Sequence, residues 1–448
     1  MSDLSMRFKE LTTNGLCVAI VLGLLIRLLF IPFSLEIDSN FWVLVVRNIE
    51  SGNGLYMMEG YYYTPIWGYI LGFVAGIQNS ILDIGDLSVI CYDLISYYAV
   101  DQYSYTDMAA SIVFLFLLKV ILWVSDLILS ITVYHLVKDR TGDEKKAIIA
   151  FLLVFICPHV IGSSSVIVMP DTISAMFTVV TIMLMRKDRY FLAGICYSFA
   201  VWVKFFPLAI VLVLLSYIYI KVDGEGRIAL KRMALSLAGF LVASFVIFFP
   251  QIMEGTLDRS LAFFTDRISE TISYGIVSII LALVSVAFAG LVTLFVVRHM
   301  LTASGNLDDR VMEYSMVILC VCMLLFTNMQ YVVTLMPFLV YCIMVVDQHY
   351  KYIWTVLAIA GVILTFMLNT NVVMLNSLVA YTGVMSTETV LAIFDFLNTG
   401  VFFGMSIVDI FCSIGTNLQK IILFCILPLF IIRRMIINNK IPRWHHER

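Results

Sequence analysis

Charged residues are scarce in this sequence: they make up 13% of its 448 residues, whereas hydrophobic residues make up 61%. A chain with so little charge carries far more apolar surface than one soluble domain could bury, which excludes an ordinary soluble enzyme. Alternation of apolar and polar residues at the strand period is also absent, so helices rather than a barrel would satisfy the backbone in lipid. The composition therefore predicts an all-α, polytopic integral membrane protein.

Other absences exclude further classes of protein. No phosphate-cradling glycine-rich loop ends in Lys-Ser or Lys-Thr, which argues against an ATP-driven pump. The net charge of −3, without a basic soluble domain, argues against a nucleic-acid partner. The nine cysteines lie mostly within predicted helices and give neither a disulfide framework nor a zinc site. No small-residue cleavage site follows the first apolar stretch, 16–33, so we expect a retained helix rather than a signal peptide.

Apolar runs separated by polar or helix-breaking residues predict about twelve transmembrane helices in a single membrane domain, 1–448. Their expected ranges are 13–33, 110–137, 147–161, 171–185, 190–203, 207–220, 233–250, 274–297, 312–326, 331–346, 352–369 and 416–434.

Lysine and arginine are distributed unevenly among the connecting segments. With the N-terminus in the cytoplasm, about three quarters of the 28 basic residues fall on cytoplasmic segments, including a basic tail at 435–448. This bias predicts that both termini are cytoplasmic and that the segments 34–109, 251–273 and 370–415 face outward. The apolar run 66–77 is too short to span, which predicts an interfacial or re-entrant helix, and 389–412 predicts a second such element or a hidden helix pair.

The outward segment after the first helix contains two carboxylates, Glu36 and Asp38. Carboxylates held against a bilayer are costly to desolvate, so their presence in an otherwise apolar protein suggests a chemical role rather than a structural one. If the backbone is extended there, residues two apart share a face and the pair could act together. The pair could orient a base, hold a divalent metal such as Mg²⁺ or Mn²⁺, or be solvated surface charge.

Five separated landmarks resemble, in their order along the chain, those of polytopic glycosyltransferases of the GT-C class. The resemblance is greatest to polyprenyl-phosphate-dependent hexosyl and mannosyl transferases and to the catalytic subunit of glycosylphosphatidylinositol mannosyltransferase I. The landmarks are Glu36 with Asp38; Tyr61-Tyr62-Tyr63-Thr64-Pro65 with the helix from Lys119 to Asp126; Cys157-Pro158-His159 with Ser163-Ser164-Ser165 and Asp171; Lys204-Phe205-Phe206-Pro207; and Thr327-Asn328-Met329-Gln330-Tyr331 with Pro337. Met329 stands where the class usually has proline, and the acid pair is Glu-x-Asp rather than Asp-x-Asp.

The resemblance implies an inverting transferase that moves a hexose, mannose or glucose, from a polyprenyl-phosphate donor to a lipid-linked or surface glycan acceptor at the extracytoplasmic face. Asp38 would be the general base, and Glu36 would orient it or hold a metal. The implied substrate-binding residues are the phosphate-facing cations Lys204, Arg267 and Arg259, the polar groups Gln330, Tyr331, His159 and Asp171, and the sugar-stacking rings Tyr61 and Tyr63.

Structural roles compete with each of these assignments. Lys204 could snorkel to the interface, and the tyrosines 61–63 with Trp67 could form an aromatic belt. Asp171 could cap a helix after Pro170, and His159 could be a core residue. Lys119 and Asp126, seven residues apart, could form a structural ion pair within their helix.

Two other functions stay open at the level of the sequence. One is a glycan polymerase or ligase of the O-antigen type, although that class usually places its large outer loop late rather than first. The other is a lipid or solute transporter, a class that usually has repeated halves, and no repeat is visible here.

Overall fold

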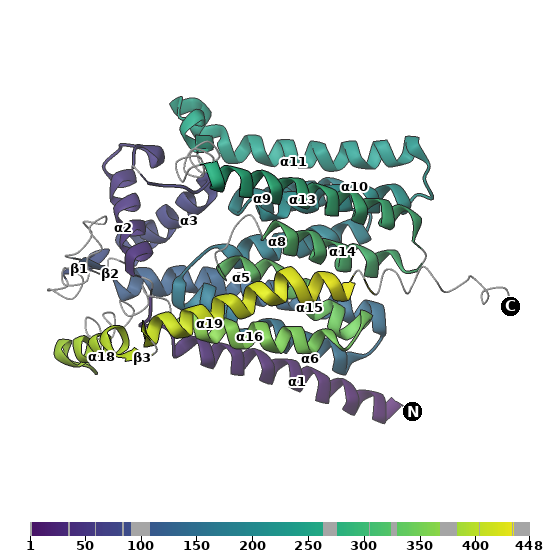
Figure 1. Cartoon of the computed structure of the whole chain (residues 1–448). Coiled ribbons are helices and arrows are strands. Elements are labelled where there is room, and N and C mark those ends of the chain that lie inside the picture. The colour runs from purple at the N-terminus through teal and green to yellow at the C-terminus, as the bar shows by residue number, and fades with distance from the viewer. Residues whose placement is uncertain are drawn as a thin grey trace.

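The protein is an all-α membrane protein, described here in a computed structural model (Figure 1). The structure describes residues 2–34, 36–58, 60–82, 85–90, 108–262, 276–303, 305–323, 329–367, 383–402, 404–431 and 433. Strands occur in these ranges only as two short antiparallel pairs, β1 (Ser88–Ile90) with β2 (Met108–Ala110) and β3 (Val401–Phe402) with β4 (Met405–Ser406).

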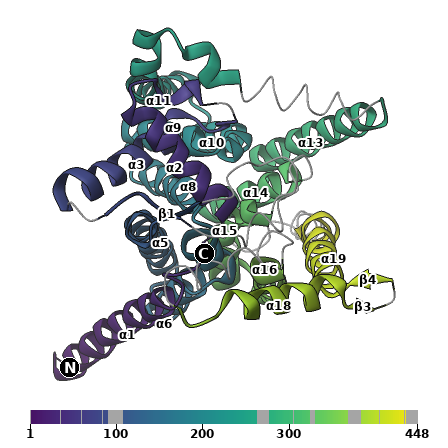
Figure 2. The same ribbon diagram turned by 90° about the vertical axis from the view of Figure 1, so that its left-hand side faces the viewer.

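Long helices lie roughly along one axis and form the body of the molecule (Figure 1). They are α1 (Ser2–Leu28), α5 (Ile112–Thr141), α6 (Glu144–Phe155), α8 (Asp171–Arg186), α9 (Tyr190–Val203), α10 (Val211–Ile220), α11 (Gly226–Glu254), α13 (Ile276–Thr302), α14 (Leu307–Cys322), α15 (Val332–Tyr341), α16 (Tyr350–Met367) and α19 (Ile407–Ile421). Three further helices, α2 (Glu36–Glu50), α3 (Pro65–Gly76) and α18 (Thr387–Thr399), gather with the strands at the end of the body away from the start of α1. Figure 2 looks onto that end.

Within the described ranges, four helical stretches are long and apolar enough to cross a bilayer: Pro65–Leu82, Ile112–Thr141, Gly226–Glu254 and Ala282–Thr302. A fifth arises if the bent pair Glu144–Phe155 and Pro158–Ile167, at 43° to each other, is one span. Large apolar side chains also cover the outside of the body, among them Val18, Leu25, Leu241, Val246, Leu283 and Leu291. Apolar surface of this extent suits lipid contact, so the protein is embedded in a membrane.

Several predicted helix boundaries differ from the observed ones for identifiable reasons. The run expected at 147–161 is broken, because Pro158 lacks the N–H that would continue α6 and instead begins α7 (Pro158–Ile161) and the π-helical turn η3 (Gly162–Ile167). The last predicted helix begins at Ile407 rather than at 416. The run expected at 66–77 continues through a π-helical turn to Leu82 and is therefore long enough to span.

Two buried charges on α5 find different partners, so the expected ion pair between Lys119 and Asp126 is wrong. Asp126 pairs with Arg27 of α1, whose Nη2 lies 2.7 Å from Asp126 Oδ2, and both side chains are fully buried. Lys119 donates instead to the carbonyl oxygens of Phe30, Ile31 and Phe33 just after α1. These contacts fix the end of α1 against α5 and thereby set where α2 begins.

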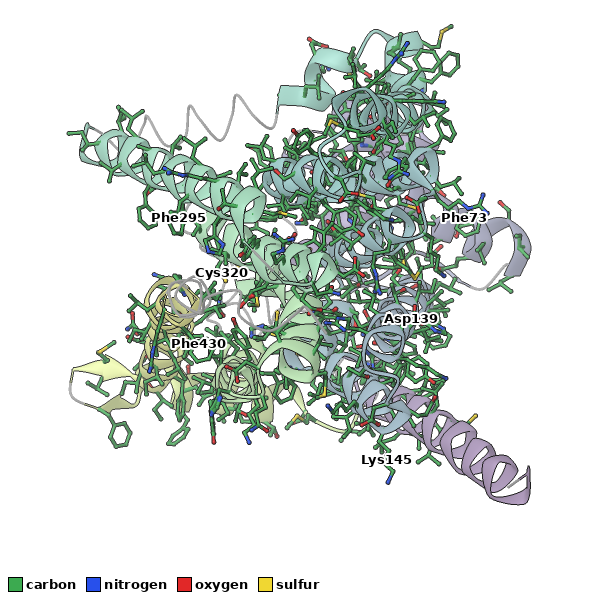
Figure 3. All side chains as sticks on the ribbon, turned by 90° about the vertical axis from the view of Figure 1, so that its right-hand side faces the viewer. Phe73, Asp139, Lys145, Phe295, Cys320 and Phe430 are labelled. Carbon is green, nitrogen blue, oxygen red and sulfur yellow. The ribbon has the colours of Figure 1, made fainter. Side chains whose placement is uncertain are left out.

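Two further ion pairs between helices lie at the opposite end of the body. Arg140 Nη2 lies 2.9 Å from Asp309 Oδ2, and Arg186 Nε lies 3.0 Å from Asp308 Oδ2. Figure 3 looks onto this end and labels Asp139 and Lys145 there. These pairs join α5 and α8 to the start of α14.

Candidate functional site

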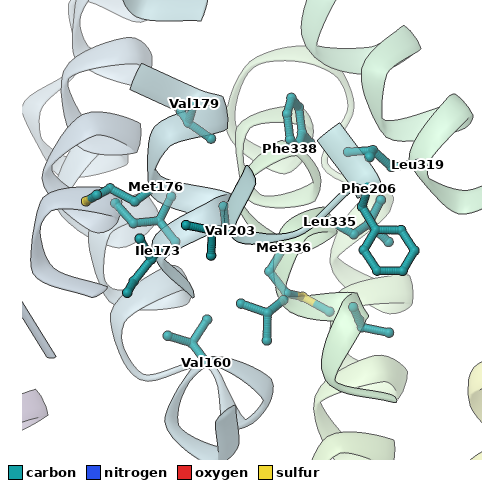
Figure 4. Packing of buried hydrophobic residues seen from close by; sticks show 14 of the residues in the cluster. Val160, Ile173, Met176, Val179, Val203, Phe206, Leu319, Leu335, Met336 and Phe338 are labelled. Carbon is teal, nitrogen blue, oxygen red and sulfur yellow. The ribbon is translucent and has the colours of Figure 1, made fainter. Parts of the chain in front are cut away.

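Lys204 is held at the point where α9 stops. The backbone turns extended at Lys204, and Pro207 lies in the 3₁₀ turn Phe206–Ile210 that follows. The neighbours Val203 and Phe206 are buried in the same hydrophobic cluster as Leu335 and Met336 of α15 (Figure 4). Packing on both sides of Lys204 therefore leaves its side chain little freedom of direction.

The ammonium group of Lys204 lies among aromatic rings and a carboxylate. Its Nζ is 4.5 Å from the ring centroid of Tyr63, 5.4 Å from that of Tyr331 and 3.9 Å from Asp171 Oδ2. The Tyr63 hydroxyl is 3.4 Å away and accepts a long hydrogen bond. Only 12% of the side chain is exposed. Burial alone would lower the pKa of Lys204, but Asp171 and the two tyrosines outweigh it and raise that pKa, so the group stays cationic.

Asp171 belongs to this cluster and does not cap its helix. The cap position of α8 is Pro170, and Asp171 is the first helical residue, so the expected capping role is wrong. Its side chain is 1% exposed, and neither carboxylate oxygen has a hydrogen-bond partner among the described residues. A buried carboxylate with only a cation at 3.9 Å keeps acceptor capacity for another donor.

Asp38 occupies the first turn of α2, where the helix dipole favours a carboxylate. The side chain is partly buried, and burial raises its pKa to about 6, while the charge of Lys204 opposes that rise. A carboxylate with a pKa near 6 is a stronger base than ordinary aspartate and is still ionised at neutral pH.

Glu36 begins α2, so the backbone there is helical and the shared face that depended on an extended segment does not apply. The side chain of Glu36 lies outside the described residues. Within the described residues, no three or more His, Cys, Asp or Glu side chains are grouped so that they could hold a metal ion.

The Tyr61–Pro65 stretch joins α2 to α9. Trp42 of α2 packs edge-on against Tyr63 and Trp67, with ring centroids 5.2 and 5.7 Å apart. The hydroxyl of Thr64 donates to the carbonyl oxygen of Trp202, two residues before Lys204. These contacts bring Asp38, Tyr63 and Lys204 together although they lie far apart in the sequence.

Not every predicted tyrosine faces the site. Tyr61 is 7% exposed and donates to the carbonyl oxygen of Thr64, so it packs inside the stretch. Trp67 is 1% exposed, and neither of these residues is placed as a lipid-facing belt would require.

The other predicted site residues lie elsewhere or outside the described residues. His159 is buried, and its Nε2 lies 2.9 Å from the carbonyl oxygen of Leu357, which ties α7 to α16. Arg259 is exposed and contacts the sulfur of Met57. Gln330 precedes Tyr331 at the edge of the cluster and is partly buried. Arg267 lies outside the described residues, as do Thr327 and Asn328.

One contact in the cluster is not predictable from the sequence. The hydroxyl of Tyr63 lies 3.3 Å from the sulfur of Met169, 106 positions away. A methionine next to a proline looks like any other apolar residue in a membrane helix, so only the fold reveals this contact.

No protein-family model matches the sequence, and a search of curated proteins finds no match.

Proposed function

We propose that the protein is a membrane glycosyltransferase similar to the GT-C class, which moves mannose or glucose from a polyprenyl-phosphate donor to a lipid-linked or surface glycan acceptor. The observation that carries the proposal is the meeting of Asp38, Tyr63, Asp171, Lys204 and Tyr331 at one end of the helical body. These five residues come one from each of the five sequence landmarks. A cation, two carboxylates and two aromatic rings are the groups that a phosphate-linked sugar requires.

The arrangement of the helices supports a twelve-span topology with this end outside. The stretch Pro65–Leu82 is long enough to cross a bilayer but is not counted as a span, because α3 lies with α2 at the end of the body (Figure 1). The bodies of α1, α5, α6, α8, α9, α10, α11, α13, α14, α15, α16 and α19 correspond to the twelve expected spans. Successive helices run in alternating directions, and α2, α3 and α18, which belong to the long connections, lie together at one end of the body (Figure 1). The bias of lysine and arginine places the other end, with both termini, in the cytoplasm.

In the proposed reaction, Asp38 accepts the proton of an acceptor hydroxyl while that oxygen attacks the anomeric carbon of the donor. The bond from the anomeric carbon to the phosphate oxygen breaks in the same step, and polyprenyl phosphate leaves with the bonding electrons. Attack opposite to the leaving group inverts the anomeric configuration. No step in this scheme passes through a metal ion.

Lys204 would bind the phosphate of the donor and keep that contact as the phosphate departs. Its weak existing contacts, 3.4 Å to the Tyr63 hydroxyl and 3.9 Å to Asp171, leave its N–H groups available to a stronger acceptor. The rings of Tyr63 and Tyr331 hold the cation while restricting water, which strengthens its interaction with a phosphate. The donor's own lipid chain would remain in the bilayer.

The test is release of free polyprenyl phosphate by the purified protein in lipid, given a panel of polyprenyl-phosphate sugars and an acceptor extract. We expect one donor to be consumed and Asp38→Asn to lower turnover by about 10²–10⁴-fold, because the amide cannot accept the proton. Asp258→Asn is the matched control, since Asp258 is exposed near the same end, and it should keep wild-type turnover. Near wild-type turnover by a folded Asp38→Asn protein would remove Asp38 as the base, and no donor consumption by the wild type would contradict the function itself.

A further inference from the structure

The segment that carries Asp171 has a strained backbone. After the π-helical turn η3, Val168 adopts φ 62° and ψ 55°, a left-handed conformation that is an outlier for a β-branched residue. Val168 is fully buried, and the amide of Met169 donates to the carbonyl oxygen of Ser163 at 2.9 Å, which closes the turn. Such a conformation persists only where neighbouring groups hold it.

A buried hydrogen-bonded unit lies directly against this segment. The hydroxyl of Ser164 donates to Asp126 Oδ2 at 2.7 Å, and the same oxygen accepts from Arg27 Nη2 at 2.7 Å and Nε at 3.1 Å. The guanidinium of Arg27 also lies 4.1 Å from the ring centroid of Phe155 and donates to the carbonyl oxygen of Gly23. The unit therefore ties η3 to α1 and α5 at once.

A second contact anchors the next residue of the segment. The indole N–H of Trp123, one turn before Asp126 on α5, donates to the hydroxyl of Ser165 at 2.8 Å. Both hydroxyls of the Ser164–Ser165 pair are thus fixed by α5. The anchored turn leads within seven residues to Asp171, and on the way Met169 accepts from the hydroxyl of Tyr63.

We propose that Arg27, Asp126 and Ser164 are positioning residues, which hold the 162–171 segment so that Asp171 stands 3.9 Å from Lys204. The proposal rests on the proposed function, because it assigns the unit a part in binding the phosphate of the donor. Asp171 holds the Lys204 cation in place without a direct hydrogen bond, and the anchored turn sets that separation. Loss of the anchor lets the carboxylate move relative to the cation and weakens the contact of Lys204 with the donor.

The testing variant is Ser164→Ala, which removes one hydroxyl and leaves the Arg27–Asp126 pair intact. Ser198→Ala is the matched control, because Ser198 is also fully buried and its hydroxyl makes one side-chain contact, 3.0 Å to Ser244. Two measurements are made on each full-length protein in lipid: amide hydrogen exchange of 162–171, and kcat and KM for the donor identified in the turnover assay.

We expect Ser164→Ala to speed exchange in 162–171 and to raise the donor KM about tenfold with kcat unchanged, as loss of uniform donor binding would. Ser198→Ala should change neither quantity. A merely structural role would instead lower kcat in proportion to the folded fraction and leave KM as in the wild type, and that result would overturn the proposal. Unchanged exchange in 162–171 would overturn it as well.

The two proposals fail separately. If the wild type consumes no donor, the proposed function is lost, and exchange in Ser164→Ala then decides whether the anchor exists. Faster exchange would uphold the anchor as a property of the fold, whereas unchanged exchange would reject it.

Discussion

At the scale of single residues, the Lys204 cation acts on the charge of Asp38. Burial disfavours the ionised Asp38 and raises its pKa to about 6, and the Lys204 cation works in the opposite direction. A proton acceptor must be ionised before it acts, so the pKa of Asp38 should appear in the pH dependence of turnover.

We predict that kcat/KM of the wild type rises with pH through about 6 and then levels, because Asp38 loses its proton there. Lys204→Met should move this rise to higher pH, since removal of the cation takes away the influence that lowers the pKa of Asp38. It should also reduce donor affinity by roughly 10–100-fold, the size of a hydrogen bond between charged groups.

The measurement is a pair of pH–rate profiles between about pH 4.5 and 8. Lys351→Met is the control, because Lys351 is exposed in the first turn of α16 and is not among the charges that act on Asp38, so its profile should overlay that of the wild type. A rise at the same pH with and without Lys204 would mean that the two charges do not interact.

Single residues of the site are predictable from the sequence where they carry a charge in an otherwise apolar chain. The resemblance implies Lys204 as a phosphate-facing cation, and the position of Asp38 marks it as an outward carboxylate. The structure brings these two together with Tyr63, Tyr331 and Asp171. The partner of Asp126 was not predictable, because Arg27 lies 99 positions away and sequence spacing favoured Lys119 on the same helix. Spacing identifies neighbours within a helix and gives no information about neighbours between helices.

At the scale of elements, α9 and α11 pack so closely that their backbones touch at two glycines. A Cβ atom on Gly194 would lie 1.9 Å from the carbonyl oxygen of Ser236, and one on Gly239 would lie 2.0 Å from that of Phe191. Small residues permit this approach between membrane helices, where packing rather than the hydrophobic effect drives association.

We predict that Gly194→Ala separates the two helices and lowers the free energy of unfolding by about 1–3 kcal/mol or more, as overpacking does. Gly290→Ala is the matched control, because Gly290 lies within α13 and a Cβ atom there meets no heavy atom within 4 Å. The midpoint of thermal unfolding in detergent is measured for both variants, and that of Gly290→Ala should equal the wild-type midpoint or lie slightly above it. Equal midpoints for the two variants would show that α9 and α11 do not need the close approach.

The position of a helix is predictable from the sequence when the helix is apolar along its whole length. The range 190–203 matches α9 at both ends, whereas α2 was not predicted as a helix because polar residues at its start, including Asp38 and Asn40, obscured its buried face. That face becomes visible only once Trp42, Val43 and Val46 are seen packed in the core.

At the scale of the whole molecule, the site lies at one end of the body, and the ion pairs Arg140–Asp309 and Arg186–Asp308 lie at the other. A cysteine introduced at Asn53, in the exposed turn after α2, should react with a membrane-impermeant maleimide on intact cells. A cysteine at Glu225, in the exposed connection before α11, should react only after permeabilisation.

Wild-type protein gives the background from the native cysteines, of which Cys17 is exposed in α1. The reverse labelling pattern would invert the topology and move the proposed donor to the cytoplasmic leaflet. Lysine and arginine counts determine orientation well because insertion responds to them directly, but they carry no information on which outer segments meet in space.

The close approach of α9 and α11 at Gly194 and Gly239 couples the site to the bilayer. Most of α11 faces outward, with Leu241 and Val246 among its exposed side chains, so its tilt follows the thickness of the surrounding hydrocarbon. Touching backbones cannot slide past each other as layers of flexible side chains can, and α9 must therefore tilt with α11. Since Lys204 ends α9 while Asp38 belongs to α2, acyl-chain length becomes a variable that sets the separation of cation and base.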